Sequence, residues 1–199
     1  MTEKRPYTLR ERAKGQDETR RRIVEAAMEL HEEIGPRATT ISAIAQRAGV
    51  QRLTVYRHFH DEAAVFEACT AHWLTLHPPP DPAAWQRLAD PWARLEAALA
   101  AFYAYYRATR GMWTASHRDV AEVPALQGPM AAFAAHLDTL AAALAADFSA
   151  DAVIASRLLA TVRHVLAFPV WAELESRGLD DATKLVLALD WLRGVSRAG

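Results

Sequence analysis

Apolar residues recur every three or four positions through most of this chain, and Gly or Pro stands where each pattern stops. That spacing places the apolar side chains on one face of an α-helix. Strands need alternating patterns and branched or aromatic residues, whereas 42 of the 199 residues are alanine, the best helix former. The sequence therefore predicts an all-α fold of about nine helices.

Composition excludes several other classes of protein. Apolar residues make up 51% and charged residues 24% of the chain, which is typical of a globular protein rather than a disordered one. No uncharged stretch reaches the ~18 residues that a membrane span needs, and the charged N-terminus does not resemble a signal peptide. A single cysteine, Cys69, excludes an internal disulfide. We expect a cytoplasmic protein without a membrane partner.

The near-neutral net charge of −1 conceals a division along the chain. Residues 1–60 contain 12 Lys and Arg against 8 Asp and Glu, whereas the remaining residues contain 11 against 16. A basic N-terminal segment followed by an acidic remainder suggests that only residues 1–60 bind a polyanion. A chance fluctuation is the alternative, because the excess is small.

The ends of the helices are predicted from capping residues. Residues 1–16 are basic and lack apolar periodicity, so we expect a flexible basic arm there, followed by a helix from an Asp17 cap to Gly35. Pro169 is expected to bend a long helix near the C-terminus. The other predicted helix starts are Thr40, Asp61, Asp90-Pro91, Pro129, Ser149 or Asp151, and Asp180.

Residues 39–62 contain two short helical patterns separated by a tight turn at Gly49, which is the spacing of a helix-turn-helix. Four apolar residues, namely Ile44, Val50, Val55 and Phe59, are expected to pack against Leu30 and Ile34 of the preceding helix. The opposite face of the last pattern is left to polar and basic side chains that hydrogen-bond well to base edges and phosphates. A structural helical hairpin that never meets DNA is the alternative.

This stretch resembles the DNA-binding domain of the tetracycline-repressor (TetR) family. The similarity covers residues 17–66 and is specific, because the turn and the run after it occur together with the right spacing. The residues that carry it are Thr40, Ile44-Ala45, Ala48-Gly49-Val50 and Thr54-Val55-Tyr56-Arg57-His58-Phe59.

The resemblance implies a role for each matching position. Phosphate contacts are implied for Thr40 and Ser42 and for Tyr56 and His58. Base edges in the major groove are implied for Gln51, Arg52, Leu53 and Thr54, while Arg57 suits either role.

Three positions depart from the usual family pattern, namely Gln51, Leu53 and Glu62. Glu62 stands where a lysine often contacts phosphate, so its carboxylate is expected to oppose DNA binding. The departure at Gln51 is expected to change the base preference, whereas Leu53 is expected either to contact a thymine methyl group or to crowd the groove.

The resemblance also implies that residues 67–199 form a helical domain for ligand binding and dimerisation. Its last two helices carry apolar stripes suited to a four-helix bundle across a two-fold axis. A homodimer of this kind would bind a palindromic operator in double-stranded DNA. The implied function is a repressor that a small, largely apolar effector releases.

Aromatic residues among alanines favour either an effector pocket or a plain core in this domain. The aromatic candidates for ligand binding are Trp92, Phe102, Tyr103, Tyr106, Trp113, Phe133, Phe168 and Trp171. The polar candidates that would orient a ligand are Arg107, His117, Arg118 and His136.

Two alternatives to a regulator remain. One is an enzyme, and the other is a helical scaffold with a degenerate helix-turn-helix that does not bind DNA specifically. The sequence has no inward-facing Glu-x-x-His pairs, zinc spacing, Gly-rich phosphate loop or nucleophile elbow. We therefore expect no catalytic activity, no cofactor and no metal. Steep salt dependence of DNA binding would separate the regulator from both alternatives.

Overall fold

The structure, a computed structural model, describes residues 4–148 and 151–197. These residues form ten α-helices and two short 3-10 helices, with no strand among them, which confirms the predicted all-α class. The helices are α1 (Lys4–Glu33), α2 (Ile41–Arg47), α3 (Arg52–His58), α4 (Glu62–Leu76), α5 (Pro91–Ala108), α6 (Arg110–Asp119), α7 (Pro124–Ala145), α8 (Ala152–Val165), α9 (Phe168–Ser176) and α10 (Asp181–Arg197).

Ten helices replace the expected nine because Pro169 separates α8 from α9 instead of bending one long helix. Proline lacks an N–H and clashes with the preceding turn, so it is tolerated in the first turn of α9 and not inside a helix that continues from α8. Together α8 and α9, bent by 60°, have the length and composition of a broken membrane span, but no single helix among the described residues does.

The start of α1 differs from the prediction. The helix begins at Lys4, so residues 4–16 are helical rather than a flexible arm, and Asp17 lies inside the helix instead of capping it. Residues 7–14 contain Arg, Glu, Ala and Lys, which propagate a helix well even without an apolar stripe. The Thr19 hydroxyl donates to the Gly15 carbonyl at 2.8 Å inside α1.

Most of the other predicted helix starts are confirmed, and Ser149, the alternative to Asp151, lies outside the described residues. The side chains of Thr40, Asp61, Asp90, Asp151 and Asp180 each accept a hydrogen bond from a backbone N–H in the first turn of the helix that follows.

The predicted start at Pro129 is wrong, because α7 begins at Pro124 and passes through Pro129. Pro124 presets the backbone for the first turn, and the helix continues beyond Pro129 at the cost of one internal hydrogen bond.

The chain divides into two compact units, which do not follow the predicted boundary at residue 67. The reader unit comprises the chain up to Pro78 together with Thr114–Pro129. The bundle unit comprises Pro79–Trp113 and the chain from Met130 onward. Thus α4 and the end of α6 belong with the helix-turn-helix.

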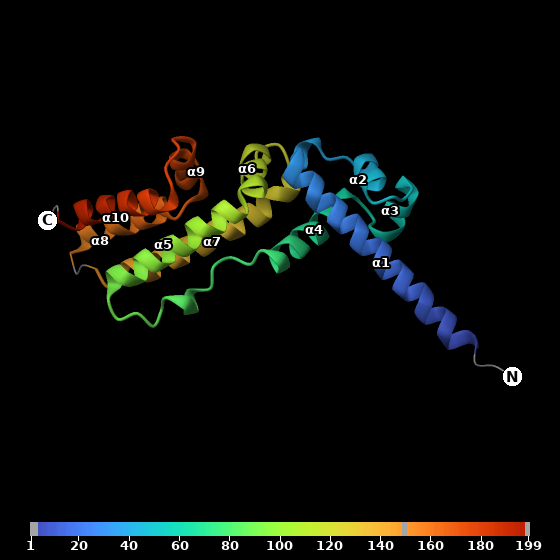
Figure 1. Cartoon of the computed structure of the whole chain (residues 1–199), viewed down its shortest axis with the longest axis horizontal. Coiled ribbons are helices and arrows are strands. Elements are labelled where there is room, and N and C mark those ends of the chain that lie inside the picture. The colour runs from blue at the N-terminus through green and yellow to red at the C-terminus, as the bar shows by residue number, and fades with distance from the viewer. Residues whose placement is uncertain (1–3, 149–150, 198–199) are drawn as a thin grey trace. The chain divides into compact units, whose positions relative to one another are not determined.

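In the reader unit, α2, α3 and α4 pack against α1 (Figure 1). Val55 of α3 is fully buried, and Phe59 and Ile44 are nearly so, as the spacing predicted. Leu30 of α1 joins this core. The expectation for Ile34 is wrong: its side chain is 43% exposed, because α1 ends at Glu33 and Ile34 lies beyond the helical face.

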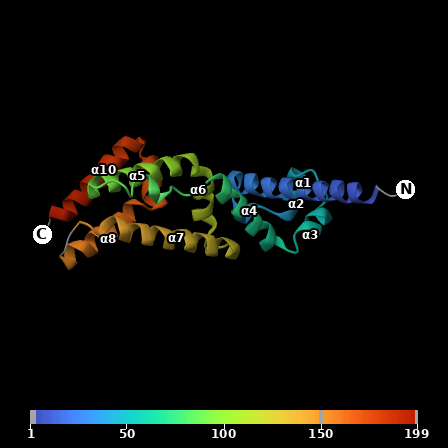
Figure 2. The same cartoon turned by 90° about the horizontal axis from the view of Figure 1, so that it is seen from below.

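In the bundle unit, α10 packs against both α5 and α8 (Figure 2). Leu95 and Leu99 of α5, Val162 of α8 and Leu192 of α10 are buried, because the apolar stripe of each helix faces the others. Trp85, which follows a short 3-10 helix (Pro82–Ala84), is also buried and lies 6.4 Å from the Phe102 ring.

Candidate functional site

A tight turn holds α2 and α3 of the reader unit together. Gly49 adopts a φ of 65°, a left-handed conformation that residues with a Cβ rarely adopt. The N–H of Val50 donates to the Ala45 carbonyl at 2.9 Å and closes the end of α2. At its start, Thr40 accepts from the Ala43 N–H at 3.1 Å. Both ends of α2 are thereby fixed.

The turn leaves one face of α3 uncovered. Leu53 is 69% exposed and Tyr56 37% exposed, whereas Val55 between them is fully buried. The structure places the predicted DNA-binding residues as follows: Thr40, Ser42, Gln51, Arg52, Leu53, Tyr56 and Arg57 are exposed, and Thr54 and His58 are half-buried.

Two of these side chains contact each other across one turn of α3. The Arg52 guanidinium donates to the Tyr56 hydroxyl at 3.3 Å and lies 5.6 Å from the ring centroid of Tyr56. This hydrogen bond raises the pKa of Arg52. A positive charge and a hydroxyl are therefore presented side by side on an exposed helical face, which is suited to phosphate and base-edge acceptors.

Three arginines that the sequence analysis missed position this face. Arg20 of α1 donates to the His58 carbonyl at 3.0 Å and lies over the Phe59 ring at 4.1 Å. Arg22 donates to the Ala48 carbonyl at 3.2 Å. The run of arginines at positions 20–22 was the available signal, since cations suit the carbonyl ends of helices.

The third arginine, Arg47 at the end of α2, pairs with two glutamates of α1. Its guanidinium donates to Glu33 at 2.7 and 2.9 Å and to Glu29 at 3.1 Å. These contacts raise the pKa of Arg47 and lower that of Glu33. The charge of Arg47 therefore attaches α2 to α1.

A buried carboxylate connects the end of α6 to the end of α1 within the reader unit. Asp119 is 2% exposed and accepts from the Arg37 N–H at 3.0 Å and from the Arg118 guanidinium at 2.7 Å. Arg118 also donates to the Ile34 carbonyl at 2.9 Å. A Cβ on Gly35, whose φ is 92°, would lie 1.8 Å from Arg118 Nη2, so this contact requires glycine.

Changing Asp119 to Asn is expected to lower the free energy of unfolding by about 1.5 kcal/mol. The amide oxygen still accepts a hydrogen bond from the Arg37 N–H, but the negative charge that pairs with Arg118 is lost. In the wild type, the hydrogen bond from Arg118 stabilises this charge and lowers the pKa of Asp119. Urea denaturation measures the change. Glu122→Gln is the control, because Glu122 is exposed and its ion pair with Arg37 contributes little. Equal effects of the two substitutions would contradict the assignment.

In the bundle unit, most of the predicted aromatic residues form one cluster. Tyr106 lies at its centre, with ring centroids 5.9 Å from Phe102, 6.0 Å from Trp113, 5.4 Å from Phe168 and 6.1 Å from Trp171. All five side chains are buried. This cluster is a packed core in the single chain.

Two tyrosine hydroxyls attach the cluster to the α8–α9 connection. Tyr103 donates to the Val165 carbonyl at 3.1 Å, and Tyr106 donates to the Leu166 carbonyl at 2.7 Å. Burial raises the pKa of both tyrosines. Phe133 joins the cluster, with its ring centroid 4.3 Å from that of Trp113. Tyr105, which was not among the predicted residues, has its ring centroid 6.3 Å from that of Trp113.

The remaining predicted ligand residues lie elsewhere or have other contacts. Trp92 contacts Phe148 near the start of α5, about 20 Å along the helix from Tyr106. Arg107 is exposed and pairs with Asp181. His136 is half-buried, 6.2 Å from Phe133, while His117 and Arg118 belong to the reader unit.

A buried ion network borders the cluster and was not predicted. Lys184 of α10 is fully buried, donates to Glu175 and Asp181, and lies 4.7 Å from the ring of Trp171. The Trp171 indole N–H donates to Asp181 at 3.1 Å. Lysine inside an apolar stripe gave no signal in the sequence, because its partners come from α9 and α10 together.

Comparison with known proteins gives a consistent result for the reader unit. Residues 23–69 match the family described as bacterial regulatory proteins, tetR family. The HTH-type transcriptional regulator SrpR of Pseudomonas putida is 41% identical over 68 residues, which cover 33% of this chain and 32% of SrpR. An uncharacterized HTH-type regulator, TtgW of the same species, is 42% identical over 67 residues, 32% of this chain and 50% of TtgW. The chain thus matches at most half the length of these relatives.

The fold extends the likeness beyond the reader unit. The crystal structure of NalD, the secondary repressor of the MexAB-OprM multidrug efflux pump in Pseudomonas aeruginosa, superposes with a TM-score of 0.62 over 94% of this chain and all of NalD. Its sequence identity of 24% makes this a likeness of fold alone. The matched family is one of bacterial regulatory proteins. The helix-turn-helix domain therefore resembles that of the tetR family of bacterial regulatory proteins, and the chain as a whole shares the fold of TetR-like transcriptional regulators.

Proposed function

We propose that this protein is a repressor that binds a palindromic DNA operator as a homodimer. The exposed face of α3, with Arg52 and Tyr56 side by side over a buried Val55, is the observation that carries the proposal. A short helix with such a face fits the major groove, where these side chains reach base edges and phosphates. Thr40 and Ser42, exposed at the start of α2, are suited to the adjacent phosphate.

The homodimer is proposed to form through α8 and α10. Four large apolar side chains of these helices are exposed in the single chain, at 59% for Val153, 39% for Leu159, 57% for Val186 and 41% for Trp191. Burying such residues against a second copy is favourable, and a two-fold axis makes the interface self-complementary. Two reading heads related by that axis suit a palindromic operator.

A small, largely apolar effector is proposed to release the repressor from DNA. The aromatic cluster of the bundle unit is the proposed site, and admitting a ligand requires its packed rings to move apart. An effector that favours the conformation with lower DNA affinity must lower that affinity by the same coupling free energy. NalD, which shares the fold, is itself described as a repressor.

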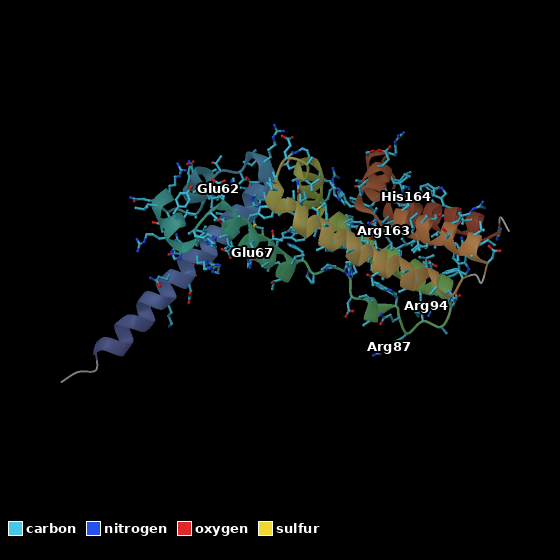
Figure 3. The ribbon with its side chains drawn as sticks, turned by 180° about the vertical axis from the view of Figure 1, so that it is seen from behind. Glu62, Glu67, Arg87, Arg94, Arg163 and His164 are labelled. Atoms are coloured by element: carbon cyan, nitrogen blue, oxygen red, sulfur yellow. The ribbon has the colours of Figure 1, made fainter. Side chains whose placement is uncertain are left out.

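Operator binding is expected to fall about 100-fold in a double variant with Arg52→Ala and Tyr56→Ala, since each loses a contact to a phosphate or a base edge. The operator is first selected from genomic DNA fragments with the purified protein, and its affinity is then measured by fluorescence anisotropy at two salt concentrations. Arg87→Ala is the control, because Arg87 is an exposed arginine of the bundle unit (Figure 3).

The salt dependence of the same titrations tests the mode of binding. The wild type is expected to lose affinity steeply as salt rises, and the double variant less steeply, because fewer counterions are released. Failure to enrich any sequence, or equal affinities of the double variant and Arg87→Ala, would overturn the proposal.

Replacing Trp191 by Glu is expected to weaken dimerisation at least tenfold. In the proposed dimer the apolar indole, which is exposed in the single chain, becomes buried, and a carboxylate in its place would have to be buried as a charge. Leu88→Glu is the matched control: Leu88 is 39% exposed and lies outside α8 and α10. Sedimentation equilibrium measures the dissociation constants. A monomeric wild type, or the same constant for both variants, would contradict an interface at α10.

A further inference from the structure

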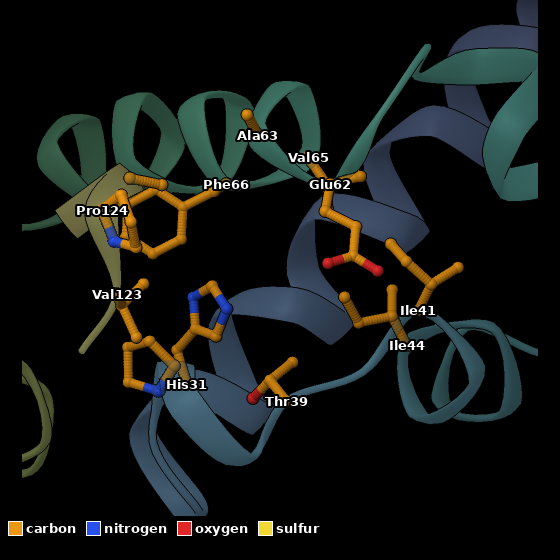
Figure 4. Close-up of a pocket in the computed structure, with 12 residues that line it drawn as sticks. His31, Thr39, Ile41, Ile44, Glu62, Ala63, Val65, Phe66, Val123 and Pro124 are labelled. Atoms are coloured by element: carbon orange, nitrogen blue, oxygen red, sulfur yellow. The ribbon is translucent and has the colours of Figure 1, made fainter. Parts of the chain in front are cut away.

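A cavity of about 310 Å³ lies within the reader unit, behind the helix-turn-helix (Figure 4). Ile41 and Ile44 of α2 form one wall, Phe66 of α4 forms another, and Val123 and Pro124 come from the segment between α6 and α7. These residues all belong to the same compact unit. The cavity is therefore a feature of the reader unit alone.

Glu62 supplies the only formal negative charge among the residues that line this cavity. Figure 4 shows its carboxylate directed into the cavity, beside Ile41 and Ile44 and toward His31. The Glu62 side chain is exposed and forms no ion pair within the described part of the chain, and Arg52 of α3 acts on its charge only at longer range. An exposed carboxylate beside apolar walls, without an ion-pair partner of its own, favours a cationic occupant.

The opposite side of the cavity offers two aromatic rings. The His31 and Phe66 rings lie 5.2 Å apart and are tilted by 41°. Burial lowers the pKa of His31 to about 4, so the imidazole carries no charge at neutral pH. Neutral rings beside a carboxylate accommodate the apolar body and the delocalised charge of an organic cation.

We propose that this cavity binds a small aromatic cation, such as an amidine or an arylalkyl amine, with its charged head on Glu62 and its ring among Phe66, Ile41 and Ile44. The site differs from the effector site proposed in the bundle unit. It does not rest on the proposed function, because the binding is measured without DNA. The volume admits a ring with one short substituent and excludes large drugs.

Ligand binding in this cavity is coupled to the helix-turn-helix through α2. Ile41 and Ile44 form the buried side of α2, and Thr40 and Ser42 at its start are exposed toward the proposed interface. Any difference in ligand affinity between the free and the DNA-bound protein appears as an equal change in DNA affinity.

Benzamidine is the probe, and benzamide, which has nearly the same shape without the charge, is its neutral control. Binding to the full chain is followed by the methyl NMR resonances of the five isoleucines. The resonances of Ile41 and Ile44 are expected to shift with benzamidine, while that of Ile154 in α8 stays unchanged. Benzamide is expected to bind at least tenfold more weakly.

Two variants separate the site from nonspecific attraction. Glu62→Gln is expected to weaken benzamidine binding about tenfold, because a charge-assisted contact is lost. Glu67→Gln, on the same helix and exposed but outside the cavity lining, is expected to leave it unchanged (Figure 3). Equal weakening by both variants, equal binding of benzamide, or unshifted Ile41 and Ile44 resonances would overturn the proposal.

Discussion

Replacing Lys184 by Met is expected to lower the free energy of unfolding by about 3 kcal/mol. The side chain is fully buried, and methionine retains its aliphatic packing but leaves the carboxylates of Glu175 and Asp181 without their central cation. The expected loss stands at the lower end for a broken buried pair, because Arg110 and Arg107 still pair with these two carboxylates. Urea denaturation followed by circular dichroism measures it.

Lys14→Met is the matched control, because Lys14 is exposed on α1 and its replacement is expected to change the free energy by less than about 0.5 kcal/mol. Adding Glu175→Gln and Asp181→Asn to the Lys184 variant is expected to restore part of the loss, since neutral amides cost less to leave without a cation. A Lys184 variant as stable as the Lys14 control would show that the network contributes nothing to stability.

Acid is expected to destabilise the protein through His31. Burial lowers its pKa from about 6.5 to about 4, and the nearby Asp119 carboxylate opposes this only in part. The unfolded chain therefore binds more protons than the native one between pH 6.5 and pH 4. Above pH 6.5 His31 is neutral in both states and does not lower the free energy of unfolding. As the pH drops toward 4, protonation of His31 in the unfolded chain lowers this free energy by roughly 3 kcal/mol.

His31→Phe removes this titratable group and keeps a ring at the same position. In the wild type, the centroid of the His31 ring lies 5.2 Å from that of Phe66, and its Nδ1 lies 3.5 Å from the Cys69 sulfur. The free energy of unfolding of His31→Phe is expected to depend less on pH between 4 and 6.5 than that of the wild type. His60→Gln is the control, because the His60 side chain is 84% exposed. The same pH slope in the wild type and in His31→Phe would assign the acid sensitivity to other groups.

Local rules predicted much of the secondary structure. Five capping side chains begin their helices as expected, because a cap depends on residues within one turn. The errors at Asp17 and Pro129 have the same origin: neither residue terminates a helix when the residues around it continue the backbone pattern. The turn at Gly49 was predictable for the same local reason as the caps.

The exposed face of α3 was also predictable, since helical periodicity alone separates Val55 from Arg52 and Tyr56. The aromatic cluster was predictable only as a set of residues. Periodicity does not tell which rings meet, so Trp92 was grouped with Tyr106 although they lie at opposite ends of α5.

The sequence by itself determined the all-α class, the helix-turn-helix and its outward face, because these depend on spacing within a few turns of helix. Only the tertiary structure decided the surroundings of Glu62, Asp119 and Lys184. The sequence suggested a carboxylate facing DNA at Glu62, whereas the folded chain directs it into a cavity. Asp119 is buried against Arg37, 82 positions away, and Lys184 against an indole from another helix. The charges of Asp119 and Lys184 are buried because other segments of the chain supply their partners, which the spacing within one helix does not predict.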